Sequence, residues 1–130
     1  MSIKTAGLSH VAIRVTNLAR AKRFYTETLG FPMVVEEDGL VIVNADGMYL
    51  ALDSGAPETR RDEKFDPFRV GLDHLALAVS TQQLEGLKRQ LDVSGVRNNG
   101  IETDPTLGGK YISFYDPDGI ALELYALPAS

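Results

Sequence analysis

The sequence contains no cysteine, no long apolar run and no dense basic cluster. Without cysteine, disulfide bonds, thiol nucleophiles and thiolate metal ligands are excluded. The apolar runs are a few residues long, whereas a membrane-spanning helix needs about 20 apolar residues. No basic cluster is larger than the pair Arg60–Arg61, in a chain with a net charge of −5. We therefore expect neither nucleic acid nor a membrane as a partner.

The first residues also lack the apolar core of a secretory signal, so we expect a cytoplasmic protein. The length of 130 residues suits one domain, or two very small halves that share a core. The hydrophobic fraction of 44% is ordinary for a globular protein, and the acidity indicates solubility.

What the sequence does contain is a repeat marked by its two histidines. His10 lies in "GLSHVAIRV", residues 7–15, and His74 lies in "GLDHLALAV", residues 71–79, at a constant offset of 64. Glycine, leucine, histidine, alanine and valine recur at the same places in both stretches. Both stretches alternate with a period of two, as strands do, so each histidine shares a strand face with small alanines.

The two halves are predicted to have the same order, β-α-β-β-β. Leucine, alanine and tyrosine at helical spacing predict a helix from Leu18 to Leu29, and leucines predict a second from Leu84 to Leu91. Asn17 is the expected N-cap of the first helix, and Ser80 with Gln83 forms a capping box for the second. The remaining strands are expected at about residues 31–37, 39–44, 48–53, 98–103, 110–115 and 120–126.

These elements predict an α+β fold of two βαβββ modules in tandem, at about 5–53 and 71–127. The polar, charged and proline-containing segment 54–70 is expected to be a linker or a mobile flap. One helix covers one face of a four-stranded sheet, so the uncovered faces need each other, from the same chain or from a second one. Two sheets that face each other would form a cup whose lining includes both histidines.

A third residue of interest is Glu123, in the final strand "GIALELYAL". A carboxylate in an otherwise apolar strand is costly unless it is paired or binds a metal. If the first and last strands of a module are neighbours, His74 and Glu123 approach each other, and His10 arrives from the facing module. Two imidazoles and a carboxylate form a set that holds a divalent metal with open positions. The place equivalent to Glu123 in the first half is Ala51, so a fourth carboxylate is absent.

The paired modules, the histidine on each first strand and the closing stretch "FYDPDGIALELY" resemble the vicinal oxygen chelate superfamily. This superfamily contains glyoxalase I, fosfomycin resistance enzymes, bleomycin resistance proteins and extradiol dioxygenases, and the resemblance covers residues 5–127. The resemblance implies a metal held by His10, His74 and Glu123. Ser113 stands where the ring-cleaving dioxygenases carry a tyrosine, and the segment 98–112 holds no histidine, so the pattern departs from theirs.

We therefore expect a metal-dependent enzyme that acts on a small oxygenated molecule, of lyase, isomerase or dioxygenase type. The ion, Fe²⁺, Zn²⁺, Mn²⁺ or Ni²⁺, would take two neighbouring oxygens of the substrate into its open positions and act as a Lewis acid. The alternative is a protein that sequesters a small molecule without turnover, as bleomycin resistance proteins do, and a third option is a member with an unfilled site. The general base is not identified by the sequence.

Five further residues are expected at the rim or wall of the cavity, where they would contact the substrate: Arg14, Tyr49, Lys110, Tyr111 and Tyr125. Lys110 and Tyr111 follow two glycines in a loop, Arg14 shares the strand face of His10, and Tyr49 and Tyr125 are expected to line the pocket. For each of them, solvent exposure or ordinary strand packing is the competing explanation. The superfamily often pairs modules between two chains, so we also expect a homodimer.

Overall fold

The first unit of the structure, Met1–Glu63, consists of a four-stranded sheet and one helical segment. The structure is a computed structural model and describes residues 2–55 and 61–128. The sheet has the order β1-β4-β3-β2, so the first and last strands are neighbours, and they run parallel. The elements are β1 (His10–Arg14), α1 (Leu18–Arg23), β2 (Met33–Glu37), β3 (Leu40–Ala45) and β4 (Met48–Asp53).

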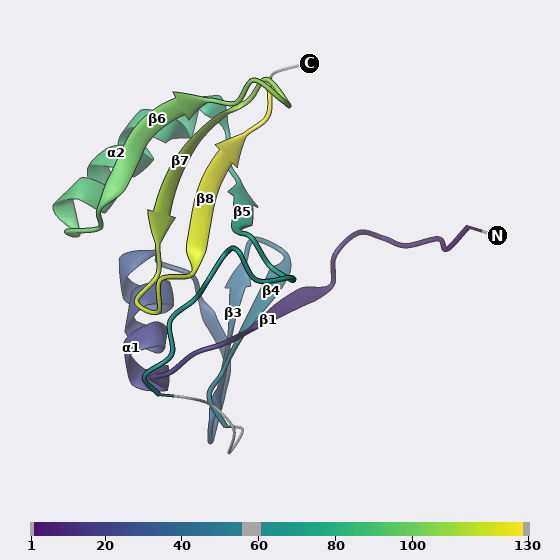
Figure 1. Ribbon diagram of the computed structural model, residues 1–130, viewed down its shortest axis with the longest axis vertical. Helices are drawn as coiled ribbons and strands as arrows, with labels where there is room; N and C mark the ends of the chain where they lie inside the picture. The colour runs from purple at the N-terminus through teal and green to yellow at the C-terminus, as the bar shows by residue number, and fades with distance from the viewer. Residues whose placement is uncertain (1, 56–60, 129–130) are drawn as a thin grey trace. The chain divides into compact units, whose positions relative to one another are not determined.

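The second unit, Lys64–Ser130, repeats this arrangement, with the sheet order β5-β8-β7-β6 and parallel pairing of β5 with β8 (Figure 1). Its elements are β5 (Leu75–Ala78), a 3₁₀ turn (Thr81–Gln83), α2 (Leu84–Val93), β6 (Asn98–Thr103), β7 (Lys110–Tyr115) and β8 (Ala121–Ala126). The predicted α+β fold with two βαβββ modules is therefore confirmed. Of the predicted linker 54–70, residues 56–60 lie outside the described part of the chain.

Both helices begin at the residues that the sequence indicates. The Asn17 side-chain oxygen accepts a hydrogen bond from the Arg20 amide at 3.0 Å, which satisfies a backbone donor in the first turn of α1. The Gln83 side-chain oxygen accepts one from the Ser80 amide at 2.9 Å, as in a capping box.

The first helix differs from its prediction in its second half. Regular α-helix ends at Arg23, and a π-helical turn, Phe24–Thr28, completes the segment with a hydrogen bond from the Leu29 amide to the Phe24 carbonyl at 2.9 Å. Spacing of apolar residues cannot distinguish this wider turn from α-helix over five residues. Tyr25 lies in this turn and is the largest fully buried side chain among the described residues of the unit.

The hydrophobic core of each unit lies between the helix and one face of its sheet. In the first unit, α1 contacts β3 and β4, whose fully buried residues are Val41, Val43, Leu50 and Leu52. In the second unit, α2 contacts β6 and β7, and the fully buried side chains include Ile112, Phe114 and Leu122. Within each unit's described residues, no helix covers the opposite face of the sheet. That face carries His10 in the first unit and Glu123 in the second.

The first strand of each module is shorter than its apolar stretch. The structure has β1 at His10–Arg14 and β5 at Leu75–Ala78, so His74 stands immediately before its strand. Leu72, which precedes β5, is 39% exposed. In the described part of the chain, every helix is too short or too polar to cross a bilayer.

Leu122 tests the core of the second unit, because it is fully buried and lies between Leu75 of β5 and Phe114 of β7 in the sheet register. Leu122→Ala should lower the free energy of unfolding by about 2–5 kcal/mol through lost burial and a cavity. Urea unfolding followed by circular dichroism measures the change. Val93→Ala, at an exposed position of α2, is the control and should change stability by less than about 0.5 kcal/mol. An equal loss in both variants would contradict this assignment of the core.

Candidate functional site

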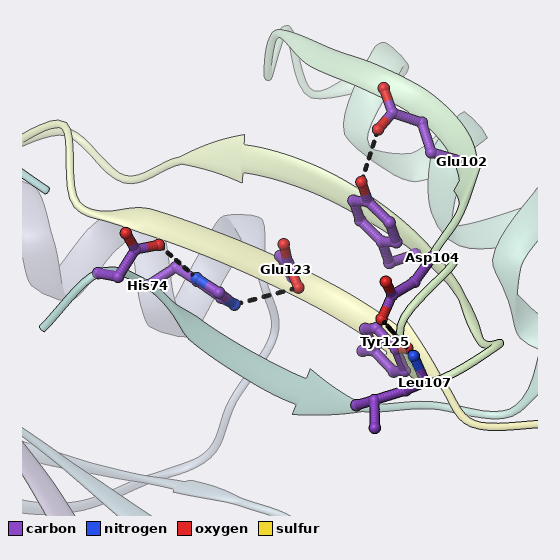
Figure 2. A network of polar contacts seen from close by, with 8 residues as sticks. His74, Glu102, Asp104, Leu107, Glu123 and Tyr125 are labelled. Atoms are coloured by element: carbon purple, nitrogen blue, oxygen red, sulfur yellow. Dashed lines mark hydrogen bonds and ion pairs between the residues drawn. The ribbon is translucent and has the colours of Figure 1, made fainter.

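The site is built on the neighbouring first and last strands of the second unit. Glu123 of β8 stands opposite Ala76 of β5 on one side and Ser113 of β7 on the other, and both of these side chains are small. His74 lies just before β5, and its Nε2 faces Oε1 of Glu123 at 3.4 Å (Figure 2). The Glu123 side chain is 19% exposed and that of His74 is 42% exposed. The sheet therefore brings these two predicted residues together.

The other ring nitrogen of His74 has a partner that determines which nitrogen carries the proton. Its Nδ1 lies 2.7 Å from Oδ1 of Asp73. An ionised carboxylate can only accept a hydrogen bond, so Nδ1–H is the donor and, in the neutral ring, Nε2 keeps its lone pair. The lone pair on Nε2 therefore points towards Oε1 of Glu123, which also carries lone pairs. Two electron-pair donors at this distance are stabilised only by a proton or a metal cation that both can bind.

These donors fit a divalent metal ion. Two ligands bound at about 2.0–2.2 Å to one ion stand roughly 2.8–3.6 Å apart for angles between about 90° and 109°. The observed 3.4 Å lies within that range and is longer than an ordinary hydrogen bond. A carboxylate on the far nitrogen is also the partner that metal-binding histidines usually have. Among the described residues, the structure contains no group of three or more His, Asp or Glu side chains that could hold a metal ion.

The third predicted ligand, His10, belongs to the first unit, where the same arrangement recurs in part. The residue before it, Ser9, places its hydroxyl 2.9 Å from His10 Nδ1. The sheet register pairs His10 with Tyr49 and Ala12 with Ala51. In the second unit, the equivalent pairing is that of Ala76 with Glu123. Ala51 is therefore the equivalent of Glu123. The exposed Arg14 forms an ion pair with Asp53 at 3.0 Å.

A pocket of about 510 Å³ adjoins the pair of His74 and Glu123 within the second unit. Ala76 and Ala78 of β5 line it, and the β6–β7 loop contributes Asp104 and Leu107. Tyr111 and Tyr125 form an aromatic wall, with parallel rings whose centroids are 5.9 Å apart. The volume is in the range of small-molecule sites.

Carboxylates hold both tyrosines of this wall. Tyr111 donates its hydroxyl hydrogen bond to Glu102 at 2.8 Å, and Tyr125 donates to Asp104 at 2.6 Å (Figure 2). The bond to Glu102, aided by partial burial, raises the pKa of Tyr111. Partial burial and the bond to Asp104 raise the pKa of Tyr125. Both phenols therefore stay protonated at neutral pH.

Asp104 also organises the loop between β6 and β7. Its carboxylate accepts hydrogen bonds from the Thr106 amide at 2.9 Å and from the Leu107 amide at 3.3 Å. The hydrogen bond from Tyr125 and those from the loop amides lower the pKa of Asp104. The carboxylate is therefore charged at neutral pH.

Of the five residues predicted to contact substrate, Tyr111 and Tyr125 line this pocket. Lys110 alternates on β7 to the face of Ile112 and Phe114 and is not part of the lining. Tyr49 is 46% exposed on the open face of its own sheet. Their roles in substrate binding stay predictions.

Sequence reasoning missed Asp73 and the two carboxylates that hold the tyrosines. Asp73 had a signal, since an acidic residue directly before a candidate ligand histidine can reach its Nδ1. Glu102 and Asp104 had none, because they meet Tyr111 and Tyr125 through strand pairing and a loop.

The comparisons with known proteins agree with this architecture. The model of the Glyoxalase/Bleomycin resistance protein/Dioxygenase superfamily matches residues 7–124. This chain belongs to that superfamily. The resemblance inferred from the sequence is therefore confirmed, and the match spans both histidines and Glu123.

Individual members of the superfamily are similar over nearly their whole length. The protein YwkD of Bacillus subtilis (strain 168) is 31% identical over 91% of this chain and 94% of its own. The metallothiol transferase FosB of Staphylococcus haemolyticus is 28% identical over 92% of this chain and 82% of its own. The crystal structure of a glyoxylase/bleomycin resistance protein/dioxygenase domain from Frankia sp. EAN1pec, 29% identical, matches with a TM-score of 0.75 over 98% of this chain and 96% of its own.

The lowered pKa of Asp104 predicts a specific pH dependence in this superfamily member. A carboxyl group whose pKa is lower in the folded state stabilises the fold above its ordinary value of 3.8, and that contribution is lost as the pH falls through the folded value. Asp104→Asn should therefore reduce stability at pH 7, and the reduction should be smaller at pH 2.5. Urea midpoints of both proteins at the two pH values test this. A difference that persists undiminished at pH 2.5 would contradict it.

Proposed function

We propose that this chain is a divalent-metal-dependent enzyme acting on a small oxygenated molecule, with His10, His74 and Glu123 as the metal ligands. The observation that carries the proposal is the apposition of the His74 Nε2 lone pair and the mostly buried Glu123 carboxylate at 3.4 Å beside a pocket. When bound, Fe²⁺, Zn²⁺, Mn²⁺ or Ni²⁺ would act as a Lewis acid towards two neighbouring oxygens of the substrate.

In this proposal the chain's own residues have separable roles. Asp73 fixes the tautomer and the orientation of His74 through Nδ1. Ala76 and Ser113 leave space beside Glu123. The tyrosine wall and Leu107 exclude water from one side of the pocket. Membership of a superfamily that includes a metallothiol transferase supports metal dependence without specifying the reaction.

The first test is metal analysis of protein purified without chelators and without a metal-affinity step. We expect about one ion per chain in the wild type. His10→Ala and Glu123→Gln should weaken metal binding by more than about 100-fold, because even an outer-shell partner contributes roughly 10- to 100-fold. Asp73→Asn should show that smaller, outer-shell loss. Glu85→Gln on α2 is the matched control and should bind as the wild type does.

Unchanged metal content in Glu123→Gln would contradict the ligand assignment. Absence of metal from the wild type even after reconstitution would favour the alternative, a protein that sequesters a small molecule without turnover. The identity of the ion separates oxygen chemistry, which needs iron, from Lewis-acid chemistry with zinc, nickel or manganese.

We further propose a homodimer in which His10 of one chain completes the site of the other. Each module leaves one sheet face uncovered by its own helix, and that face carries His10 in one module and Glu123 in the other. Mixed dimers of the His10→Ala and Glu123→Gln chains should then contain one intact site, built from the unmutated half of each chain. Such mixtures, unfolded and refolded together, should recover about one ion per mixed dimer.

Each variant refolded alone is the control and should stay metal-free. A mixture that also stays metal-free, although size-exclusion chromatography shows dimers, would place all three ligands within one chain.

A further inference from the structure

The side chains that line the pocket of the second unit offer few hydrogen-bond donors. The phenol hydroxyls of Tyr111 and Tyr125 already donate to Glu102 and Asp104, so towards a ligand their oxygens can only accept. Asp104 and Glu123 are carboxylates and also accept. Apart from these groups, the polar side chains in the lining are His74 and Thr106. A ligand that matches this lining must therefore supply donors.

The charges in the pocket also favour a ligand that is neutral or cationic. Among the described residues that line the pocket, the ionisable ones are Asp104, Glu123, His74 and the two tyrosines, and none is a lysine or an arginine. Tyr111, which pairs with Tyr125 in the sheet register, stays neutral because its hydroxyl donates a hydrogen bond to the Glu102 carboxylate, which raises its pKa. Anions near Asp104 are repelled at short range, whereas cations are attracted.

The shape of the lining favours a ring. The two tyrosine rings are stacked, 6° from parallel, and both belong to the pocket lining. Ala76, Ala78, Leu107 and Leu127 supply apolar surface around it. Aromatic surfaces of this kind bind flat rings by stacking and bind cations by their π-electrons.

We propose that this pocket selects an uncharged or cationic ring-bearing molecule with hydroxyl or ammonium donors, and disfavours ligands that carry a carboxylate or phosphonate. The donors would reach Asp104 and the phenol oxygens while the ring packs on the tyrosine wall. That the ligand also carries two neighbouring oxygens rests on the proposed metal function. The preference for a neutral or cationic ligand does not rest on the metal function, because it comes from Asp104 and the tyrosine wall.

The test uses three catechols that share a ring and two neighbouring oxygens but differ in charge: dopamine, 4-methylcatechol and 3,4-dihydroxybenzoate. Binding is measured by anaerobic isothermal titration calorimetry on the full chain after removal of metal. Dopamine and 4-methylcatechol should bind more tightly than 3,4-dihydroxybenzoate, with a ratio of about tenfold or more between the cation and the anion.

Two variants separate the contributions of charge and ring. Asp104→Asn should reduce the ratio between dopamine and 3,4-dihydroxybenzoate by at least about fivefold. Tyr111→Leu should weaken all three probes by about 3- to 10-fold and leave that ratio unchanged. Glu85→Gln removes one negative charge from α2, outside the pocket lining, and should change neither quantity.

Tighter or equal binding of 3,4-dihydroxybenzoate in the metal-free protein would overturn the proposal, as would the absence of binding by all three probes at millimolar concentration. The wild-type ranking decides this even if Asp104→Asn fails to fold. If the ranking holds while metal analysis fails, the proposed metal function falls alone. If metal loads as expected but the anion binds best without it, this proposal falls alone.

Discussion

The parallel pairing of the first and last strands of each module is the constraint on which the rest of the site depends. In the second unit it aligns Ala76 with Glu123, so that His74, just before the strand, reaches the carboxylate. The same pairing in the first unit aligns Ala12 with Ala51. A strand order without this neighbour relation would leave histidine and glutamate on one sheet but out of reach of each other, since adjacent strands are about 4.8 Å apart.

The two modules use one backbone plan for unequal chemistry. Asp73 gives His74 a fixed proton position, whereas Ser9 beside His10 has a hydroxyl that can donate or accept. In the first module, Ala51 occupies the position of Glu123. Asp53 occupies the position of Tyr125 and forms an ion pair with Arg14. The second module thus carries the denser set of electron-pair donors, and the first contributes at most His10 to the proposed ligand set.

Much of this fold follows from local patterns in the sequence. Alternation placed the strands, and Asn17 and Gln83 cap their helices as expected, because these signals act within a few residues. The matched positions of the two histidines and the carboxylate of Glu123 in the last strand led to the predicted ligand set, of which the structure brings His74 and Glu123 together. The π-helical turn at Phe24–Thr28 and the partners of the tyrosines were beyond the sequence. Apolar spacing does not resolve a wider turn, and Asp104 and Tyr125 meet across 21 residues of chain.

The contacts around Tyr125 have a thermodynamic consequence for any ligand. The Tyr125 hydroxyl donates a hydrogen bond to Asp104, and the Gly109 backbone packs so closely on the ring that a Cβ at Gly109 would clash with it. The pocket wall is therefore already ordered before a ligand arrives. Ordering a mobile side chain on binding costs about 0.5–1.5 kcal/mol, and a wall fixed in advance avoids that entropy loss. Preorganisation of this kind lets a small ligand with few contacts bind with useful affinity.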